Sequence, residues 1–400
     1  MMTNKTYSEK HVAILGCTGS VGKQAVEALS AMGCRIVLLS CGRNVDEMAR
    51  LAALCRPEAV AAESVSLGDL GVLFPGTNTK LFSGESGICE AIRASEADVI
   101  VHAVAGLAGL PYAIAAAETG ARIAMANKEV IISAGDLIRE KLEVSGGELI
   151  PVDSEHSAVF QCLASEESFR CLRKEPPSSL RRIILTASGG PFYGKTADEL
   201  DGVTVREALA HPTWKMGGKI TVDCATMMNK GFEVIEASRL FGAAPEQIDV
   251  LIHRQSVVHS MVEFKDRAVM AQLGLPDMRT CIRYAVSYPS RADVEAPSLD
   301  LLSVARLTFE EPDNKTFPLL AEAYDALKRG GTAPASLIAA DEEAVEAFMR
   351  GNIHFNDISS VVSAVIHRIP VGTVSSFDDV FRAVAETRKI AGEELRRFTL

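Results

Sequence analysis

The sequence predicts an α/β fold class with three parts: an N-terminal sheet wound with helices, a central α+β region and a C-terminal helical bundle. Two patterns carry this prediction. Short apolar runs alternate with longer amphipathic segments in the N-terminal part, and only helical patterns follow residue 317. Strands that alternate with helices are typical of a parallel sheet covered on both faces. Because 400 residues exceed one ordinary hydrophobic core, we expect two or three domains.

The elements follow from local patterns in chain order, since apolar runs predict strands and amphipathic segments predict helices. The expected N-terminal elements are strands at His11–Leu15, Arg35–Ser40, Val99–Val104, Arg122–Met125 and Glu148–Val152, and a helix at Lys23–Met32. Further along, the pattern predicts a hairpin at Met261–Leu273 that turns at Lys265 and Asp266, and helices at Leu319–Lys328, Ser336–Arg350, Ile358–His367 and Phe377–Phe398. A stretch rich in Pro, Ser and acidic residues, Ser287–Pro312, indicates a linker. We therefore predict domains at 1–152, 153–290 and 317–400, with a linker at 291–316.

The composition argues against several classes of protein. A net charge of −11 without a long basic run disfavours nucleic acid or an anionic membrane as a partner. Nine dispersed cysteines without a C-x-x-C pair are typical of reduced thiols. The polar N-terminus lacks the apolar core of a signal peptide, and the uncharged stretch Val99–Ala117 is interrupted by His102 and Pro111. We expect a cytoplasmic protein.

A glycine-rich turn follows the first predicted strand and opens the first predicted helix. Gly16, Gly19 and Gly22 are spaced as G-x-x-G-x-x-G, a variant of the dinucleotide-binding fingerprint of Rossmann-like domains. Glycines there let backbone N–H groups approach a pyrophosphate at the helix N-terminus. The alternative is a purely structural turn.

The end of the second strand indicates which dinucleotide is bound. NAD-binding sites usually place an acidic residue there, but this sequence has Ser40-Cys-Gly-Arg43-Asn44. An arginine without a nearby carboxylate favours the 2′-phosphate of NADP. Arg43 as an ordinary solvated residue is the alternative.

Two carboxylates, Asp153 and Glu155, lie two residues apart after the strand Glu148–Val152. On an extended chain they would share one side and repel each other, which predicts a divalent cation such as Mg²⁺ or Mn²⁺ between them. An N-cap at a helix start is the alternative. His156 would point elsewhere on an extended chain, and we expect it to be structural.

A third carboxylate and two phosphate-binding groups occur at a predicted helix start. Asn229 and Glu233 would lie four residues apart on one helix face beside Lys230. This set suits a phosphorylated substrate chelated by a metal, with Asn229 and Lys230 for phosphate and Glu233 for the metal. An ordinary surface pattern is the alternative.

Two loops add context. Ser188-Gly-Gly190 follows the apolar strand Ile183–Leu185 and is typical of an anion-binding turn. A capping box, Thr204–Glu207, then precedes a loop that holds the only tryptophan, Trp214, and glycines that suit a lid. Trp214 as an anchor to the core is the alternative. Together these features predict a metal-assisted NADP oxidoreductase that acts on a small phosphorylated molecule.

A series of motifs runs from residue 16 to residue 279: GCTGSVG, GRN, ANKE, PVDSEH, SGGPF, HPTWKMG, DCATMMNKGFE, HRQSVVHSM and GLPDMR. In this order they resemble the signatures of the 1-deoxy-D-xylulose 5-phosphate reductoisomerase family, and the helical tail is similar in length and pattern. The resemblance implies an NADPH-binding domain, a catalytic domain for metal and substrate, and a C-terminal bundle, usually in a homodimer. It also implies rearrangement and NADPH-dependent reduction of 1-deoxy-D-xylulose 5-phosphate to 2-C-methyl-D-erythritol 4-phosphate in the non-mevalonate isoprenoid pathway.

The resemblance assigns roles to individual residues. NADPH would contact Thr18, Gly19, Ser20, Val21, Gly42, Arg43, Asn44, Asn127, Glu129 and Gly217. Mg²⁺, Mn²⁺ or Co²⁺ would bind Asp153, Glu155 and Glu233. The substrate would contact Lys128, Ser154, Glu155, Ser188, His211, Cys224, Asn229, Lys230 and Glu233, of which Lys128, His211 and the three metal-binding carboxylates would be catalytic.

The chain departs from the family pattern at Cys224, where a phosphate-binding serine is common, and at Cys281, where a proline is common. A thiol is a weaker donor than a hydroxyl, so we expect the contact of Cys224 with the phosphate group to be weaker than that of a serine. Two rival functions remain. A related NADP dehydrogenase, similar to homoserine dehydrogenase, has no use for the phosphate-binding residues, and a non-catalytic NADP-responsive module does not require three metal carboxylates.

Overall fold

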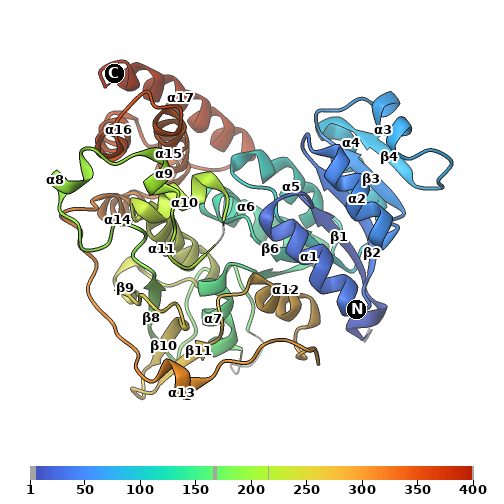
Figure 1. Ribbon diagram of the computed structural model, residues 1–400, viewed down its shortest axis with the longest axis horizontal. Helices are drawn as coiled ribbons and strands as arrows, with labels where there is room; N and C mark the ends of the chain where they lie inside the picture. Colours follow the sequence, from blue (N-terminus) through green and yellow to red (C-terminus); the bar gives the residue numbers. More distant parts are fainter. Residues whose placement is uncertain (1–5, 165–168, 215, 399–400) are drawn as a thin grey trace. The chain divides into compact units, whose positions relative to one another are not determined.

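The computed structural model describes residues 6–164, 169–214 and 216–398. Its contacts divide the chain into two compact units (Figure 1). Unit 1 comprises Met1–Val130, Ile138–Phe160 and Asp277–Pro297, and unit 2 comprises Ile131–Leu137, Gln161–Pro276 and Ser298–Leu400. Among the described residues, every helix is too short or too polar to cross a bilayer.

Unit 1 is built on a seven-stranded parallel sheet in the order β4-β3-β2-β1-β5-β6-β7. The chain order reverses between β1 and β5, and ligands of such sheets bind beyond the carboxyl ends of the strands at this point. The strands are β1 (His11–Leu15), β2 (Arg35–Cys41), β3 (Ala59–Ala62), β4 (Lys80–Ser83), β5 (Val99–His102), β6 (Arg122–Met125) and β7 (Glu148–Pro151).

The five strands predicted for this part are confirmed, and β3 and β4 were not predicted. Both have four residues, and β3 is rich in alanine, which has a low strand propensity. The helices that supply residues to unit 1 are α1 (Ser20–Ala31), α2 (Val45–Cys55), α3 (Leu67–Leu73), α4 (Gly84–Ala94), α5 (Leu110–Ala117), α6 (Lys128–Ser145), α7 (Ser154–Leu163) and α12 (Met278–Ser287), with 3₁₀ turns η1 (Tyr7–Glu9) and η2 (Leu107–Gly109).

A buried arginine ties the distant segment around α12 to the sheet. Arg122 of β6 forms an ion pair with Glu148 of β7 at 2.6 Å. Its Nη1 donates to the carbonyl oxygens of Ala285, Val286 and Tyr288. These bonds explain why residues 277–297 belong to unit 1 although most of unit 2 precedes them in the sequence. The domain boundaries at 152, 290 and 316 stay a prediction.

Unit 2 contains a four-stranded sheet in the order β11-β10-β8-β9. Its strands are β8 (Leu180–Ala187), β9 (Ile248–Ile252), β10 (Val258–Phe264) and β11 (Val269–Leu273). β10 runs antiparallel to both neighbours, so the predicted hairpin is confirmed, and β9 runs parallel to β8. The helices between these strands are α8 (Ala197–Leu200), α9 (Val205–Ala208), α10 (Gly218–Ala225) and α11 (Met228–Phe241), followed by η3 (Pro245–Gln247).

The C-terminal helices of unit 2 confirm the predicted bundle. After the short α13 (Leu301–Val304) come α14 (Leu319–Arg329), α15 (Ala333–Met349), α16 (Phe355–Arg368) and α17 (Phe377–Leu395), shown in orange to red in Figure 1. α15 packs against α16 and α17, and its buried face is formed mainly by small and aliphatic residues. Lys219 of α10 forms an ion pair with the fully buried Asp341 of α15 at 2.6 Å, which joins the bundle to the helix that carries Cys224.

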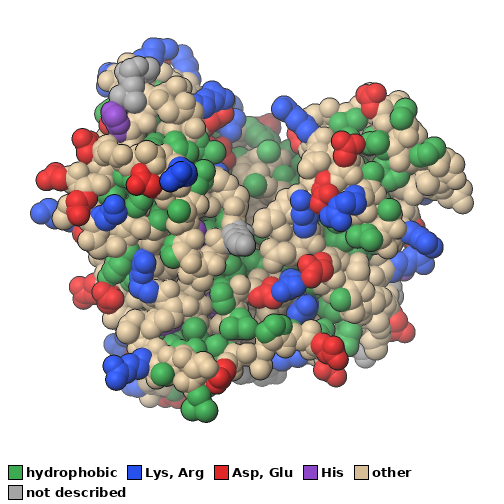
Figure 2. All heavy atoms as spheres, viewed as in Figure 1, with side chains coloured by type: hydrophobic (Ala, Val, Ile, Leu, Met, Phe, Trp, Pro, Cys, Tyr) green, Lys and Arg blue, Asp and Glu red, His purple; other side chains and the backbone are tan. Residues whose placement is uncertain are grey.

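Charges of both signs are mixed on the surface. On the face in Figure 2, the described Lys and Arg side chains are interspersed with Asp and Glu, and large areas of one sign do not occur there.

Candidate functional site

The glycine turn after β1 forms a narrow cradle in unit 1. Gly16 has φ of +76°, and a Cβ there would lie 2.6 Å from the carbonyl oxygen of Ala103. A Cβ on Gly22 would lie 2.2 Å from the carbonyl oxygen of Gly16. Gly19 is the N-cap of α1, so the N-terminus of this helix lies where the sheet order reverses. Backbone N–H groups at such a position suit a pyrophosphate.

The residues after β2 leave an arginine available. Gly42, Arg43 and Asn44 are exposed, and within the described part of the chain Arg43 has no ion pair. Asn44 caps α2, because its Oδ1 accepts the N–H of Glu47 at 3.3 Å. Glu47 itself pairs with Lys23 and Arg50. This arrangement suits a 2′-phosphate.

Asn127 is engaged by the protein itself. Its Oδ1 accepts the N–H of Val130 at 2.8 Å and caps α6. Its Nδ2 donates to the carbonyl oxygen of Gly106 at 2.8 Å, and the residue is only 1% exposed. The structure therefore gives Asn127 a role in shaping the loop after β5, and its predicted contact with NADPH, like that of Glu129, stays a prediction.

The prediction that Asp153 and Glu155 share one side of an extended chain is wrong. β7 ends at Pro151 and α7 already begins at Ser154. The N–H of Ser157 donates to the carbonyl oxygen of Asp153 at 2.8 Å, and the N–H of Glu155 donates to its Oδ1 at 3.3 Å. Asp153 therefore caps the helix, as the alternative proposed, and Glu155 lies in its first turn.

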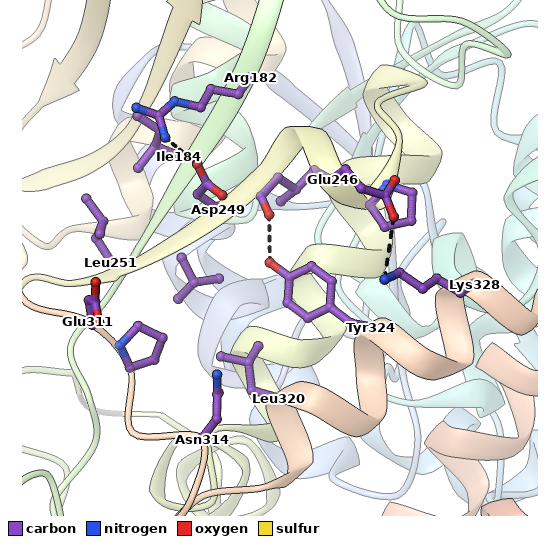
Figure 3. A pocket seen from close by; sticks show the side chains of 14 residues that line it. Arg182, Ile184, Glu246, Asp249, Leu251, Glu311, Asn314, Leu320, Tyr324 and Lys328 are labelled. Atoms are coloured by element: carbon purple, nitrogen blue, oxygen red, sulfur yellow. Dashed lines mark hydrogen bonds and ion pairs between the residues drawn. The ribbon is translucent and has the colours of Figure 1, made fainter.

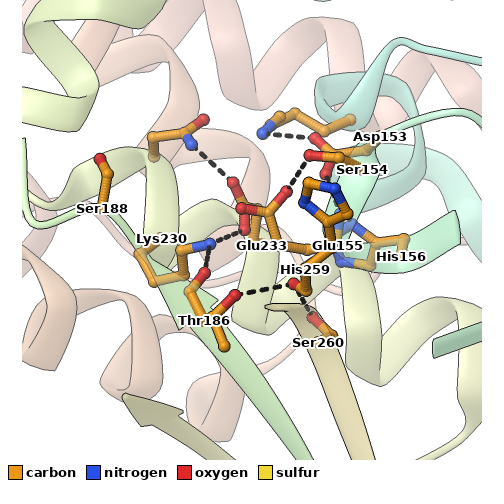
Figure 4. Close-up of polar contacts among 12 residues, drawn as sticks. Asp153, Ser154, Glu155, His156, Thr186, Ser188, Lys230, Glu233, His259 and Ser260 are labelled. Atoms are coloured by element: carbon orange, nitrogen blue, oxygen red, sulfur yellow. Dashed lines mark hydrogen bonds and ion pairs between the residues drawn. The ribbon is translucent and has the colours of Figure 1, made fainter. Parts of the chain in front are cut away.

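A lysine and a histidine side chain surround Asp153. Lys128 Nζ lies 2.9 Å from its Oδ2, and His156 Nδ1 lies 3.3 Å from its Oδ1. His156 is buried and faces Asp153, which corrects the expectation that it points elsewhere, because residues three apart on a helix are neighbours. Burial raises the pKa of Asp153, but the charge of Lys128 and the hydrogen bond from His156 outweigh it and hold the pKa well below its usual range. In the same turn, Ser154 Oγ donates to Glu155 Oε2 at 2.5 Å (Figure 4).

A second cluster lies at the start of α11 in unit 2. The predicted helical spacing is confirmed, because Asn229 Nδ2 donates to Glu233 Oε1 at 2.5 Å. Lys230 Nζ donates to Glu233 Oε2 and to the carbonyl oxygen of Thr186 (Figure 4). Lys230 is 4% and Glu233 1% exposed, so an ion pair is held in a dry environment. Buried charges of this kind are kept where they are paired.

The turn after β8 has the shape of an anion site. Gly189 and Gly190 have φ of +77° and +68°, which explains the paired glycines. A Cβ on Gly190 would lie 2.4 Å from the carbonyl oxygen of Cys224, so the turn packs directly against the end of α10. His211 Nε2 lies 3.0 Å from Ser188 Oγ, which brings together two of the predicted substrate residues.

The loop of Trp214 is tied to the same place. The N–H groups of Thr213 and Trp214 donate to His211 Nδ1 at 3.2 and 2.9 Å. The half-buried Trp214 ring lies 6.4 Å from the ring of His259. Gly217 is exposed and caps α10. Residue 215 of the predicted lid lies outside the described residues, and the lid stays a prediction.

Sequence reasoning missed Arg254. Its Nη1 donates to the carbonyl oxygens of Ser188 and Gly190 at 3.0 and 2.9 Å, and its guanidinium stacks on Tyr193. Burial, helped by the charge of Arg254, lowers the pKa of His211. The motif HRQSVVHSM contains Arg254, but nothing in its spacing shows which loop it contacts.

A pocket of about 640 Å³ lies elsewhere in unit 2 (Figure 3). It is lined by residues of β8, β9, α14 and the segment before α14. Its charged side chains include two ion pairs, Arg182 with Asp249 at 2.6 Å and Lys328 with Glu246 at 3.5 Å. None of the predicted site residues lines it, so it is separate from the clusters above.

Models of the 1-deoxy-D-xylulose 5-phosphate reductoisomerase family match three stretches of the chain. The model described simply as 1-deoxy-D-xylulose 5-phosphate reductoisomerase matches residues 12–135. Two models of C-terminal domains of this enzyme match residues 149–241 and 273–390. A 1-deoxy-D-xylulose 5-phosphate reductoisomerase of Xanthomonas euvesicatoria is 45% identical over 398 residues, which is 98% of each chain.

Solved structures agree over the same length. The 1-deoxy-D-xylulose 5-phosphate reductoisomerase of Zymomonas mobilis in complex with NADPH is 38% identical, with a TM-score of 0.87 over 97% of this chain and 99% of that one. A DOX-P reductoisomerase in complex with NADPH, fosmidomycin and magnesium is 35% identical, with a TM-score of 0.88 over 97% and 98%.

Proposed function

The chain belongs to the 1-deoxy-D-xylulose 5-phosphate reductoisomerase family, and we propose from that premise that it converts 1-deoxy-D-xylulose 5-phosphate to 2-C-methyl-D-erythritol 4-phosphate. The conversion is a rearrangement to an aldehyde followed by hydride reduction, in the non-mevalonate isoprenoid pathway. The observation that carries the proposal is the polar constellation of unit 2, in which Ser188 meets His211 and Lys230 meets Glu233. A homoserine-dehydrogenase-like enzyme has no use for it, and family membership disfavours that alternative.

The reductant in this proposal is NADPH. The cradle at Gly16–Gly22 and the exposed Arg43 support it, and relatives have been solved with NADPH bound. The proposed contacts are Thr18, Gly19, Ser20, Val21, Gly42, Arg43, Asn44, Asn127, Glu129 and Gly217. When bound, the nicotinamide supplies the hydride.

The proposed metal ligands are Asp153, Glu155 and Glu233. Carboxylate oxygens suit Mg²⁺, Mn²⁺ and Co²⁺, and the lowered pKa of Asp153 keeps this ligand ionised. A related structure contains magnesium. When bound, a divalent cation supplies Lewis-acid polarisation of a ketone and its neighbouring hydroxyl.

The remaining site residues would bind and orient the substrate. Ser188, Asn229 and Lys230 would supply donors for the phosphate group, His211 would hold Ser188 in the substrate site, and Cys224 lies beside the same turn. Ser154 lies beside Glu155, and Lys128 places a positive charge next to Asp153. A fixed ammonium in a dry site stabilises negative charge that develops on a substrate oxygen.

We also propose a cytoplasmic homodimer with three domains (1–152, 153–290 and 317–400). The edge strand β11 supports association, because its Val269, Met270 and Leu273 side chains are exposed. The nine cysteines are dispersed along the chain, as expected of thiols in a reducing compartment. Light scattering of the purified protein tests the dimer.

The decisive experiment follows NADPH oxidation with 1-deoxy-D-xylulose 5-phosphate, with and without Mg²⁺ or Mn²⁺. The proposal expects turnover that depends on both substrate and metal, and 2-C-methyl-D-erythritol 4-phosphate as the product. Tight NADPH binding without turnover in the presence of any divalent metal would disprove the proposed function.

A further inference from the structure

Ser188 is fixed by hydrogen bonds that leave its hydroxyl hydrogen for a ligand. His211 Nδ1 accepts two backbone N–H groups, so in the neutral ring the proton lies on Nε2. Nε2–H therefore donates to Ser188 Oγ, and the N–H of Gly190 donates to the same oxygen at 3.3 Å. With both lone pairs engaged, the Ser188 O–H is directed to an incoming acceptor.

Arg254 controls the backbone of this turn. Its Nη1 alone donates to two carbonyl oxygens, that of Ser188 before Gly189 and that of Gly190 after it. The two glycines of this turn have no side chains to hold it, so its backbone is held by its packing against the end of α10 and by the hydrogen bonds from Arg254. The guanidinium is itself braced against the Tyr193 ring, 5.2 Å from the ring centroid.

We propose that Arg254 is a positioning residue for the phosphate group of the substrate: it locks the Ser188–Gly190 turn so that the Ser188 hydroxyl donates to the phosphate, and it places a positive charge behind the turn. The inference rests on the proposed function and specifies how its phosphate subsite is held. It also offers a reason why a thiol at position 224 is tolerated, since the turn carries the anion without a hydroxyl there.

The test compares Arg254→Met with Arg254→Lys and with Arg267→Met, which removes an exposed arginine at the β10–β11 turn. For Arg254→Met we expect KM for 1-deoxy-D-xylulose 5-phosphate to rise about tenfold or more, with kcat changed less than about threefold. Arg254→Lys keeps the charge but loses the planar guanidinium that is braced on Tyr193 and sets the position of the bonding nitrogen, and we expect an intermediate rise. Arg267→Met should leave KM unchanged.

Binding of inorganic phosphate gives a measurement that is independent of turnover. It can be followed by the fluorescence of Trp214, the only tryptophan, whose backbone N–H donates to His211. Arg254→Met should lower the affinity for inorganic phosphate about tenfold. The same substitution should lower this affinity less in a protein that already carries Ser188→Ala, because the two residues act as a unit. If Arg254 were merely structural, Arg254→Met would instead lower the melting temperature. The effects of Arg254→Met and Ser188→Ala on phosphate affinity would then be additive.

The outcomes separate this inference from the proposed function. Phosphate affinity and KM within about twofold of wild type in a folded Arg254→Met protein would overturn the inference. If that variant fails to fold, an unchanged KM in Arg254→Lys overturns it. Wild-type protein that binds phosphate in an Arg254-dependent way but never oxidises NADPH would leave the inference standing and reject the proposed function.

Discussion

The nucleotide cradle of unit 1 and the anion-binding cluster of unit 2 are built in opposite ways. The cradle lies within one stretch, Gly16–Gly22, between a strand and the helix that follows it. The cluster joins Ser188, His211, Lys230 and Arg254, which come from four separate stretches of chain. A site made by local backbone geometry is visible in a motif. A site made by tertiary contacts is visible only as scattered polar residues, and each of its members depends on the others.

The largest expected effect comes from the carboxylate side. Asp153→Asn would remove a proposed metal ligand and leave the buried Lys128 without its full counter-charge. We expect metal-dependent NADPH oxidation to fall by about 10³-fold or more. The measurement is turnover against Mg²⁺ concentration, with Asp293→Asn, a change at an exposed aspartate, as the control. An Asp153→Asn enzyme with an unchanged metal requirement would contradict the assignment of Asp153 as a metal ligand.

The cradle can be broken by one methyl group. Gly22→Ala would put a Cβ 2.2 Å from the carbonyl oxygen of Gly16, and the backbone must shift. We expect NADPH affinity to fall about tenfold or more and stability to fall by about 1–3 kcal/mol. Gly71→Ala on α3 is the matched control, since its Cβ would meet open space. Calorimetric titration with NADPH measures the difference, and equal behaviour of the two variants would disprove the steric explanation.

A smaller and pH-dependent effect is expected at the end of β5. Burial lowers the pKa of His102 to about 4, while its Nε2 donates to the carbonyl oxygen of Gly109. The unfolded chain therefore binds a proton below about pH 6.5 that the folded chain refuses until about pH 4. The contribution of neutral His102 to the free energy of unfolding should be fully present above about pH 6.5. As the pH falls from there to about 4, the free energy of unfolding should decrease by about 2–3 kcal/mol.

Denaturant unfolding between pH 7 and pH 4, compared with His102→Gln, checks this expectation. The glutamine keeps a donor for Gly109 but does not titrate, so its stability should decrease less over the window. Parallel curves for the two proteins would show that other groups cause the loss.

The smallest effect is expected where the chain departs from its family. Cys224→Ser should change kcat and KM for 1-deoxy-D-xylulose 5-phosphate by less than about threefold, because Ser188, Asn229 and Lys230 already offer donors. Steady-state kinetics is sufficient to test this. A large loss of activity would reveal a role for the thiol, and it would also weaken the explanation given for Arg254.

Much of the fold was predictable because its elements have long periodic patterns. The hairpin at β10–β11 and the helices α14–α17 appear where alternation and amphipathicity place them. The short strands β3 and β4 escaped prediction because β3 is mostly alanine, which has a low strand propensity, and β4 begins and ends with the polar Lys80 and Ser83. The start of α7 was misjudged because a strand and a helix meet there within three residues of Pro151.

By itself, the sequence determined the features that depend on neighbouring residues: the glycine cradle, the exposed Arg43 in place of an acidic residue, and the helical spacing of Asn229 and Glu233. Only the tertiary structure decided that His211 bonds Ser188 and that Arg254 holds the turn beside it. The physical reason is that the geometry of a turn or a helix is set within a few residues. A hydrogen bond between distant loops is set by the packing of every element that lies between them in the chain.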